Sequence, residues 1–253
     1  MNRNLSPNGR EVEIDRLHRE SLEKEQAFFE RIAGRLGRPR LTAPPQRTVK
    51  GAPDFWNGYA LDREENVALF MKNWESLGGI AKRFPDAAAL GEFLEAFAAE
   101  TNVKQVIRSD HPLLEEMRVD ARLKQAEVHV WQKETGERGG HSRLLEKAAG
   151  ADLGIAVVDF AIAHTGTVVI TSGPSQGRSI SLLPTAFMGI VKASAIKTRM
   201  GEVLREIAAW NGNGLPAGIH FITGPSRSAD IENDLTIGVH GPGIVFALVL
   251  DDE

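Results

Sequence analysis

The sequence predicts an α/β protein with a mostly parallel sheet, preceded by an N-terminal helical arm. Helix-like and strand-like stretches alternate from Asp62 onward, and this alternation is typical of parallel strands joined by helical crossovers. Residues 244–250, IVFALVL, form an apolar run of strand length, which suits a strand buried on both faces. The 253 residues are enough for one large domain with a sizeable core.

The arm and its linker are expected over residues 1–50, and the α/β domain over residues 51–253. Residues 11–36 start densely charged and then bring Phe28, Phe29, Ile32 and Leu36 to helical spacing. Residues 37–55 are rich in Pro and Gly, which is typical of a linker. We expect the arm to pack on the body or on a neighbouring subunit, so a homo-oligomer formed through the arm is a hypothesis.

The elements of the domain follow from local patterns. Helices are expected where apolar residues recur every three to four positions, as for Leu90, Phe93, Leu94 and Phe97. These helices are predicted at 66–74, 87–100, 112–119 and 200–208. Strands are expected where short apolar or β-branched runs are bounded by turn residues. These strands are predicted at 80–84, 103–107, 128–131, 155–158, 167–171, 188–191, 219–222 and 244–250, with a polar bend at 159–166.

Composition excludes several classes of function. A formal net charge of −4 and a pI near 6.0 give no basic surface for a nucleic acid. No run reaches the roughly 18 apolar residues of a membrane span, and the first residues lack the apolar centre of a signal peptide. We therefore expect a cytoplasmic protein without a membrane span.

The chain has no Cys, so disulfides, a Cys nucleophile and a thiolate zinc site are excluded. Neither a dinucleotide fingerprint nor a phosphate-binding P-loop motif occurs, and there is no H-E-x-x-H motif. The seven His residues are scattered along the sequence. We therefore expect no metal site and no cofactor bound by this chain alone.

The stretch FITGPSRSADIEND, residues 221–234, is the first candidate site. A strand is predicted to end at Gly224 and to run into a helix capped by Ser226 or Ser228, where free N–H groups attract anions. Arg227 adds a permanent charge that suits a carboxylate or phosphate. The alternative is a helix cap alone, although capping does not account for Arg227 because a cation is unfavourable at a helix N-terminus.

Three further stretches carry candidate residues. In DFAIAHTGT, Asp159 and His164 are weak catalytic candidates for proton transfer, and a surface histidine in a turn is the alternative. The predicted ligand-binding residues of the three stretches are Thr165, Gly166 and Thr167, then Gln176 and Arg178 in SGPSQGRSISLLP, and His240 in GVHGPG. Arg178 and Arg227 follow different predicted strands; if they converge on one cleft, its ligand is anionic. Ordered surface loops and turns are the alternative.

Together and in this order, DFAIAHTGT, SLLP, FITGPSRSADIE and GVHGP resemble the lactate-utilisation (LUD) domain family, in particular its LutC/YkgG-like branch. They densely cover residues 159–242, and LGR at 36–38 is also similar, whereas residues 62–142 match only in general pattern. The family often has an acidic residue before Thr-Gly-Thr, where this chain has His164.

The resemblance implies a Rossmann-like layered sheet similar to ribose-phosphate isomerases and CoA transferases. It also implies a role in oxidising L-lactate to pyruvate beside cysteine-rich and iron–sulfur partner proteins. A chain without Cys holds no ordinary iron–sulfur cluster itself, so the clusters are expected on the partners. The function expected is an accessory or substrate-binding one, with a small anionic metabolite as ligand. The alternatives are a stand-alone transferase or isomerase acting on a CoA ester or sugar phosphate, and a metabolite-binding regulatory module.

Overall fold

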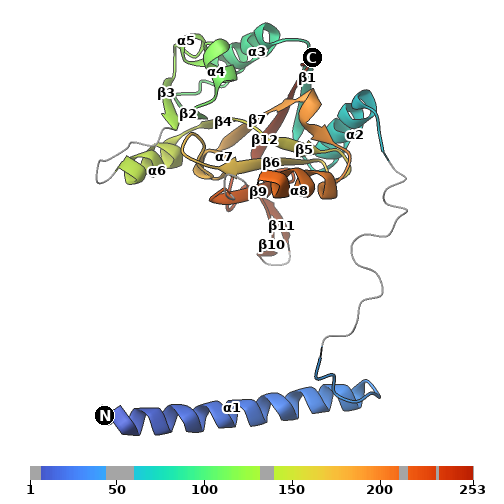
Figure 1. Ribbon diagram of the computed structural model, residues 1–253. Helices are drawn as coiled ribbons and strands as arrows, with labels where there is room; N and C mark the ends of the chain where they lie inside the picture. Colours follow the sequence, from blue (N-terminus) through green and yellow to red (C-terminus); the bar gives the residue numbers. More distant parts are fainter. Residues whose placement is uncertain (1–6, 44–59, 132–139, 211–215, 232–233, 253) are drawn as a thin grey trace. The chain divides into compact units, whose positions relative to one another are not determined.

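The structure is a computed structural model that describes residues 7–43, 60–131, 140–210, 216–231 and 234–252. It divides the chain into two compact units, Met1–Tyr59 and Ala60–Glu253. The first unit contains helix α1 (Pro7–Arg35), which confirms the predicted N-terminal helix (Figure 1). The boundary predicted at residue 50 and most of the predicted linker lie outside the described residues. Within the described ranges, no helix is both long and apolar enough to cross a bilayer.

The second unit alternates helices and strands, as expected for the α/β class. Its helices are α2 (Arg63–Ser76), α3 (Ala87–Glu100), α4 (Pro112–Glu116), α5 (Val119–Arg122), α6 (Gly140–Gly150), α7 (Ser179–Leu182), the 3₁₀ turn η2 (Ala193–Ala195) and α8 (Met200–Ala209). Its strands are β1 (Ile80–Phe84), β2 (Gln105–Ser109), β3 (Glu127–Trp131), β4 (Leu153–Val157), β5 (Phe160–Ile162), β6 (Thr167–Ser172), β7 (Ala186–Lys192), β8 (Ile196–Lys197), β9 (Gly218–Ile222), β10 (Arg227–Ile231), β11 (Asp234–Ile237) and β12 (Ile244–Leu250).

A six-stranded parallel sheet forms the centre of this unit, in the order β1-β12-β7-β4-β2-β3. Strand β12 lies between β1 and β7, and six of its seven residues are buried. Both faces of this strand are therefore covered, which is why its sequence is apolar throughout. The prediction of a buried central strand at residues 244–250 is confirmed.

Each face of the central sheet packs against its own layer. Helices α3, α4 and α5 cover one face, where Leu90, Leu94 and Leu114 join the sheet residues in one core cluster. Helices α2, α6 and α7 and a second sheet cover the other face, with Phe70 and Trp74 of α2 in that cluster (Figure 1). Asp62 begins α2 with a capping box to Glu65, in which each side chain accepts the other residue's backbone N–H.

The second sheet has the order β8-β5-β6-β9 and mixes parallel and antiparallel pairs. Its outer face packs on α8, where Val203 and Ile207 meet Phe160 and Ile162 of β5. The prediction of a polar bend at 159–166 is therefore wrong in part, because strand β5 lies within this range. Burial of Phe160 and Ile162 between two layers makes this short segment a strand despite its polar flanks.

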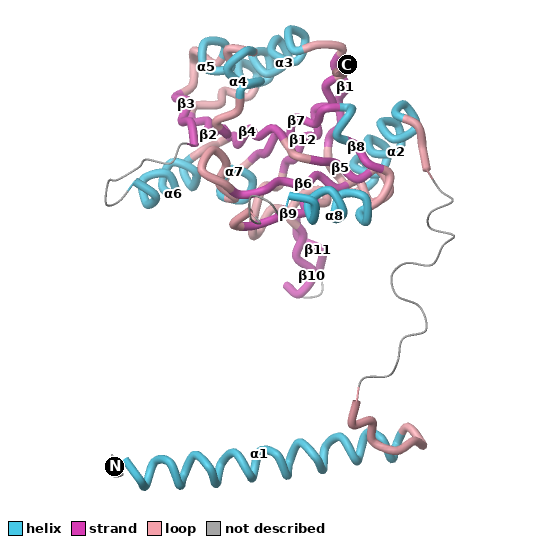
Figure 2. The backbone as a smooth tube through the Cα atoms, in the orientation of Figure 1, coloured by secondary structure: helices cyan, strands magenta, loops and turns pink. Residues whose placement is uncertain are grey.

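The predicted helix after Gly224 is wrong. Residues of that stretch form β10, which pairs antiparallel with β11 as a separate two-stranded sheet. The hairpin extends away from the other strands and from the helices of the second unit (Figures 1 and 2). Because β10 is a strand, the capping role predicted for Ser226 or Ser228 and the anion site at a helix start both disappear with the helix.

Candidate functional site

A pocket of about 380 Å³ lies at the carboxyl ends of three neighbouring strands of the central sheet. Asp110 and His111 follow β2, Val158 and Asp159 follow β4, and Lys192 ends β7. Across the sheet, the chain passes from β2 to its neighbour β3 in one direction and from β4 to its neighbour β7 in the opposite direction. The pocket therefore sits where the strand order reverses, which is where open α/β sheets bind their ligands.

A turn at residues 173–176, beyond the end of β6, forms another wall of the pocket. Its Gly173 N–H donates to the Gln176 carbonyl at 2.9 Å. The Ser175 carbonyl accepts the Asp110 N–H at 2.9 Å, and the Gln176 side-chain amide donates to the Thr171 carbonyl at 3.4 Å. The turn is thus fixed both to its own strand and to the end of β2.

Asp159 connects the two sheets and presents a carboxyl group to the pocket. Its backbone N–H donates to the Val169 carbonyl at 3.0 Å, and its Oδ2 accepts the Thr171 N–H at 2.7 Å. Burial raises the pKa of the Asp159 carboxyl above its ordinary value, while the hydrogen bonds from Thr171 and the nearby His111 partly oppose the rise. The group is a candidate for holding or moving a proton.

His111 has its ring orientation set by the start of α4. It is the N-cap of that helix, and its Nδ1 accepts the Leu113 N–H at 3.2 Å. This bond assigns the ring proton to Nε2 in the neutral form. Burial lowers the pKa of His111, the charge of Lys192 lowers it further, and Asp159 partly opposes both effects. His111 is therefore a neutral hydrogen-bond donor near pH 7.

Lys192 supplies a positive charge to the pocket. It is half-buried at the end of β7, and within the described residues its side chain forms no hydrogen bond or ion pair. Although Asp110 and Asp159 line the same pocket, the ammonium group is in no ion pair with them, so it can bind an anionic ligand.

Two of the predicted site residues, Asp159 and Gln176, line this pocket. His111 and Lys192 were missed by sequence reasoning. A signal was present, since Lys192 directly follows the strand predicted at 188–191 and His111 directly precedes the helix predicted at 112–119. What the sequence did not provide was the order of the strands, which decides which ends are neighbours.

A second group of predicted residues lies against the end of α2 instead. The hydroxyl groups of Thr165, Thr167 and Thr223 form a chain, with Oγ1 separations of 2.7 Å and 2.9 Å. The side-chain amide of Asn73 donates to the Ala163 carbonyl at 2.8 Å and to the His164 carbonyl at 3.1 Å. These contacts fasten the second sheet to α2.

Gly166 and Gly224 complete this junction. Both have positive φ, 57° and 77°. A Cβ on Gly166 would lie 2.7 Å from the Asn73 carbonyl carbon, and one on Gly224 would lie 3.0 Å from Leu77. The two glycines allow close approach of the backbone to α2, which is a packing role.

A third group lies at the base of the β10–β11 hairpin. The Ser226 N–H donates to the Pro242 carbonyl at 3.1 Å, and the Ser226 carbonyl accepts the Gly238 N–H at 2.9 Å. Arg227 is paired with Ile237 in the hairpin and extends its guanidinium to the Thr223 carbonyl at 3.4 Å. Ser228 is paired with Thr236, and His240 is exposed in the following turn.

Arg178 lies elsewhere, at the start of α7. Its charge, together with the larger effect of burial, lowers the pKa of His220, whose Nε2 lies 2.8 Å from the Ser172 hydroxyl. The structure therefore places Arg178 and Arg227 against different segments.

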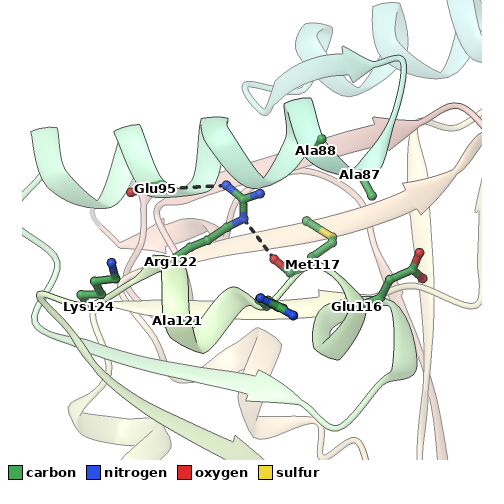
Figure 3. Close-up of a pocket in the computed structure, with 9 residues that line it drawn as sticks. Ala87, Ala88, Glu95, Glu116, Met117, Ala121, Arg122 and Lys124 are labelled. Carbon is green, nitrogen blue, oxygen red and sulfur yellow. Dashed lines mark hydrogen bonds and ion pairs between the residues drawn. The ribbon is translucent and has the colours of Figure 1, made fainter.

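A larger hollow, of about 510 Å³, lies between α3 and the α4–α5 segment (Figure 3). The guanidinium of Arg122 in this hollow is engaged within the protein. It donates to the Met117 carbonyl at 3.0 Å and pairs with Glu95 at 3.6 Å. It lies away from the strand ends that carry Asp159 and Lys192. Among the described residues, no group of three or more His, Asp or Glu side chains is arranged to hold a metal ion.

Comparison with known proteins finds relatives that match most of the chain. "Lactate utilization protein C" of Halalkalibacterium halodurans is 35% identical over 237 residues, covering 92% of this chain and 100% of the relative. The proteins of the same name from Shouchella clausii and Bacillus subtilis are 32% and 33% identical, each over 92% of this chain and over 100% and 98% of their own lengths.

A solved structure supports the fold. The crystal structure of a DUF162 family protein from Deinococcus radiodurans matches with a TM-score of 0.50 at 20% identity, covering 75% of this chain and 99% of that chain. The family model described as the LUD domain matches residues 67–250, which include every strand of the central sheet and every residue of the pocket. The chain belongs to the LUD domain family.

Proposed function

We propose that this protein is the metabolite-binding component of a bacterial lactate-utilisation system, and that it binds L-lactate or pyruvate as an anion in the pocket at the ends of β2, β4 and β7. The names of its bacterial relatives support the system. The observation that carries the binding role is Lys192, a half-buried cation without an acidic partner in the described structure.

The pocket offers complementary groups for a short 2-hydroxy or 2-oxo acid. The Lys192 ammonium is the partner for the carboxylate, and the neutral His111 presents Nε2–H to the oxygen on the second carbon. The Asp159 carboxyl and the Gln176 amide line the same space. A pocket of this volume admits a small metabolite and leaves room for water.

Oxidation of lactate removes two electrons, which need an acceptor. This chain has no Cys, so it lacks the usual ligands of an iron–sulfur cluster. We propose that cysteine-rich and iron–sulfur partner proteins hold those clusters, and that this chain presents the metabolite to them.

Titration calorimetry with L-lactate and with pyruvate tests the binding role. The Lys192→Met variant should bind either acid roughly tenfold to hundredfold more weakly, because a hydrogen bond to a charged group contributes about 1.5–3 kcal/mol. Lys192→Arg should retain part of the affinity. Lys104→Met, at an exposed lysine away from the pocket, is the matched control and should bind normally.

Equal affinity in the wild-type and Lys192→Met proteins would contradict the assignment of the pocket. A melting temperature raised by a CoA ester or a sugar phosphate, but not by lactate or pyruvate, would favour the alternative of a stand-alone transferase or isomerase, because selective binding stabilises the native state.

A further inference from the structure

The charges that line the pocket are unequal. Asp110 and Asp159 contribute two carboxyl groups, and Lys192 contributes one ammonium group. Gln176 and Thr171 are uncharged, and His111 is held neutral by its surroundings. An anionic ligand would add a third negative charge beside a single positive one, in a site where burial weakens solvation of all of them.

Of the groups present, Asp159 is the one suited to accept a compensating proton. Thr171 N–H donates to Oδ2, and protonation of Oδ1 leaves that hydrogen bond intact. His111 is less suited, because Nδ1 already accepts the Leu113 N–H and a proton there would oppose that N–H and remove the cap of α4. Asp110 is fixed to the 173–176 turn through its backbone, but within the described residues no hydrogen bond holds its carboxyl in place in the pocket.

We propose that the pocket binds an anionic ligand together with one proton, which resides on Asp159 and lies between the protein and the ligand. The inference rests on the proposed function in one respect, namely that an anion binds in this pocket. A protonated Asp159 donates its O–H to an oxygen of the ligand, so that repulsion between two carboxylates becomes a hydrogen bond.

The electrostatic surroundings of Asp159 support this assignment. Asp110 and His111 face the pocket from the end of β2, Lys192 faces it from the end of β7, and Thr171 and Gln176 contribute uncharged groups. The pKa of Asp159 is already raised by burial, and a nearby anion raises it further. At a pH between the pKa of Asp159 in the free pocket and its pKa in the occupied pocket, ligand binding takes up a proton. The affinity for the ligand therefore falls as the pH rises.

Calorimetric titration of the full chain with L-lactate and with pyruvate, in buffers of different ionisation enthalpy, measures the protons taken up. We expect uptake approaching one proton per ligand, and an affinity that falls by up to about tenfold per pH unit between pH 6 and pH 8. Asp159→Asn should bind with little pH dependence and with no proton uptake, because the amide keeps an acceptor for Thr171 N–H and carries a permanent donor.

Two variants locate the proton. Asp110→Asn removes the other carboxyl group of the pocket, and His111→Asn removes the imidazole while keeping a residue that caps α4 well. Both should retain proton uptake. Loss of uptake in either of them, with uptake intact in Asp159→Asn, would overturn the assignment to Asp159.

The outcomes separate this inference from the proposed function. Binding of either acid with unchanged affinity between pH 6 and pH 8, and without proton uptake, overturns the inference and leaves the binding role standing. Absence of binding by both acids at every pH overturns both.

Discussion

Arg108 is buried on β2, with only 1% of its side chain exposed, and it organises the segment that leads into the pocket. Its guanidinium binds both carboxylate oxygens of Asp120, at 2.6 Å and 2.9 Å, and also pairs with Glu115. Burial lowers the pKa of Arg108, but the hydrogen bonds that it donates to the two acids and their negative charges outweigh burial and raise the pKa above its ordinary value. The Arg108 guanidinium thus holds α4 and α5 against β2. It thereby also fixes the position of His111, the N-cap of α4.

Removing one of the two carboxylates that bind the buried Arg108 guanidinium should destabilise the fold. Asp120→Ala should lower the free energy of unfolding by about 3 kcal/mol, because it leaves a desolvated guanidinium with fewer acceptors. Urea denaturation followed by circular dichroism measures the loss. Glu92→Ala, at an exposed acidic residue of α3, is the control and should stay within about 0.5 kcal/mol of the wild type. Similar stability in both variants would show that Glu115 alone suffices.

Among the elements, the junction between α2 and the second sheet depends on Gly166. Gly166→Ala should lower the free energy of unfolding by at least about 2 kcal/mol, because an L-residue at positive φ costs about 1–2 kcal/mol and its Cβ would meet the backbone of α2. Gly201→Ala is the matched control. Gly201 lies in α8 with nothing within 4 Å of an added Cβ, so that change should stabilise the protein by up to about 1 kcal/mol.

Urea midpoints of the two variants test this role of the junction. A Gly166→Ala protein as stable as the wild type would contradict the close approach to α2. Loss of lactate binding at unchanged stability would instead favour the ligand-binding role predicted for Thr165, Gly166 and Thr167.

The elements that could be predicted from sequence are those whose signal is local. Predicted bounds at 80–84, 87–100 and 244–250 agree with β1, α3 and β12; apolar periodicity identifies α3, and a continuous apolar run identifies β12. The helix predicted at 112–119 is interrupted where Arg118 adopts a left-handed conformation, with φ of 50°. Strand β10 could not be predicted, because its pairing with β11 is a contact rather than a pattern.

The same distinction applies to the site. Asp159 and Gln176, which line the pocket, were singled out from sequence because each lies in a stretch that is unusual in itself. His111 and Lys192 look ordinary in sequence, and only the neighbouring order of β2, β4 and β7 brings them to one pocket. Conversely, the threonines and glycines of the two Thr-Gly motifs look like a ligand loop but lie in a packing junction.

At the scale of the whole molecule, α1 forms part of a unit separate from the α/β body. Its exposed apolar residues fall along one side at the helical period; they are Ile14, Leu17, Leu22, Phe28, Phe29, Ile32 and, just beyond its end, Leu36. A helix with such a stripe gains most of its stability from packing against a partner, which supports the hypothesis that the arm mediates association between copies of the chain.

Light scattering tests this hypothesis. A variant that begins at Ala60 should keep the melting temperature of the α/β body and should have a smaller number of chains per particle than the full protein. Phe29→Glu combined with Ile32→Glu should have the same effect in the full chain, and Glu23→Lys, on the opposite side of α1, should not. An unchanged number of chains after removal of the arm would refute the hypothesis.

The contact between Trp131 and Gly177 gives the pocket an optical readout. The buried indole at the end of β3 lies directly against Gly177, where an added Cβ would be 2.1 Å from the ring. Gly177 follows Gln176, the last residue of the turn that borders the pocket. Indole emission depends on the polarity and packing around the ring, so we expect a ligand that displaces this turn to change the intrinsic fluorescence of the protein.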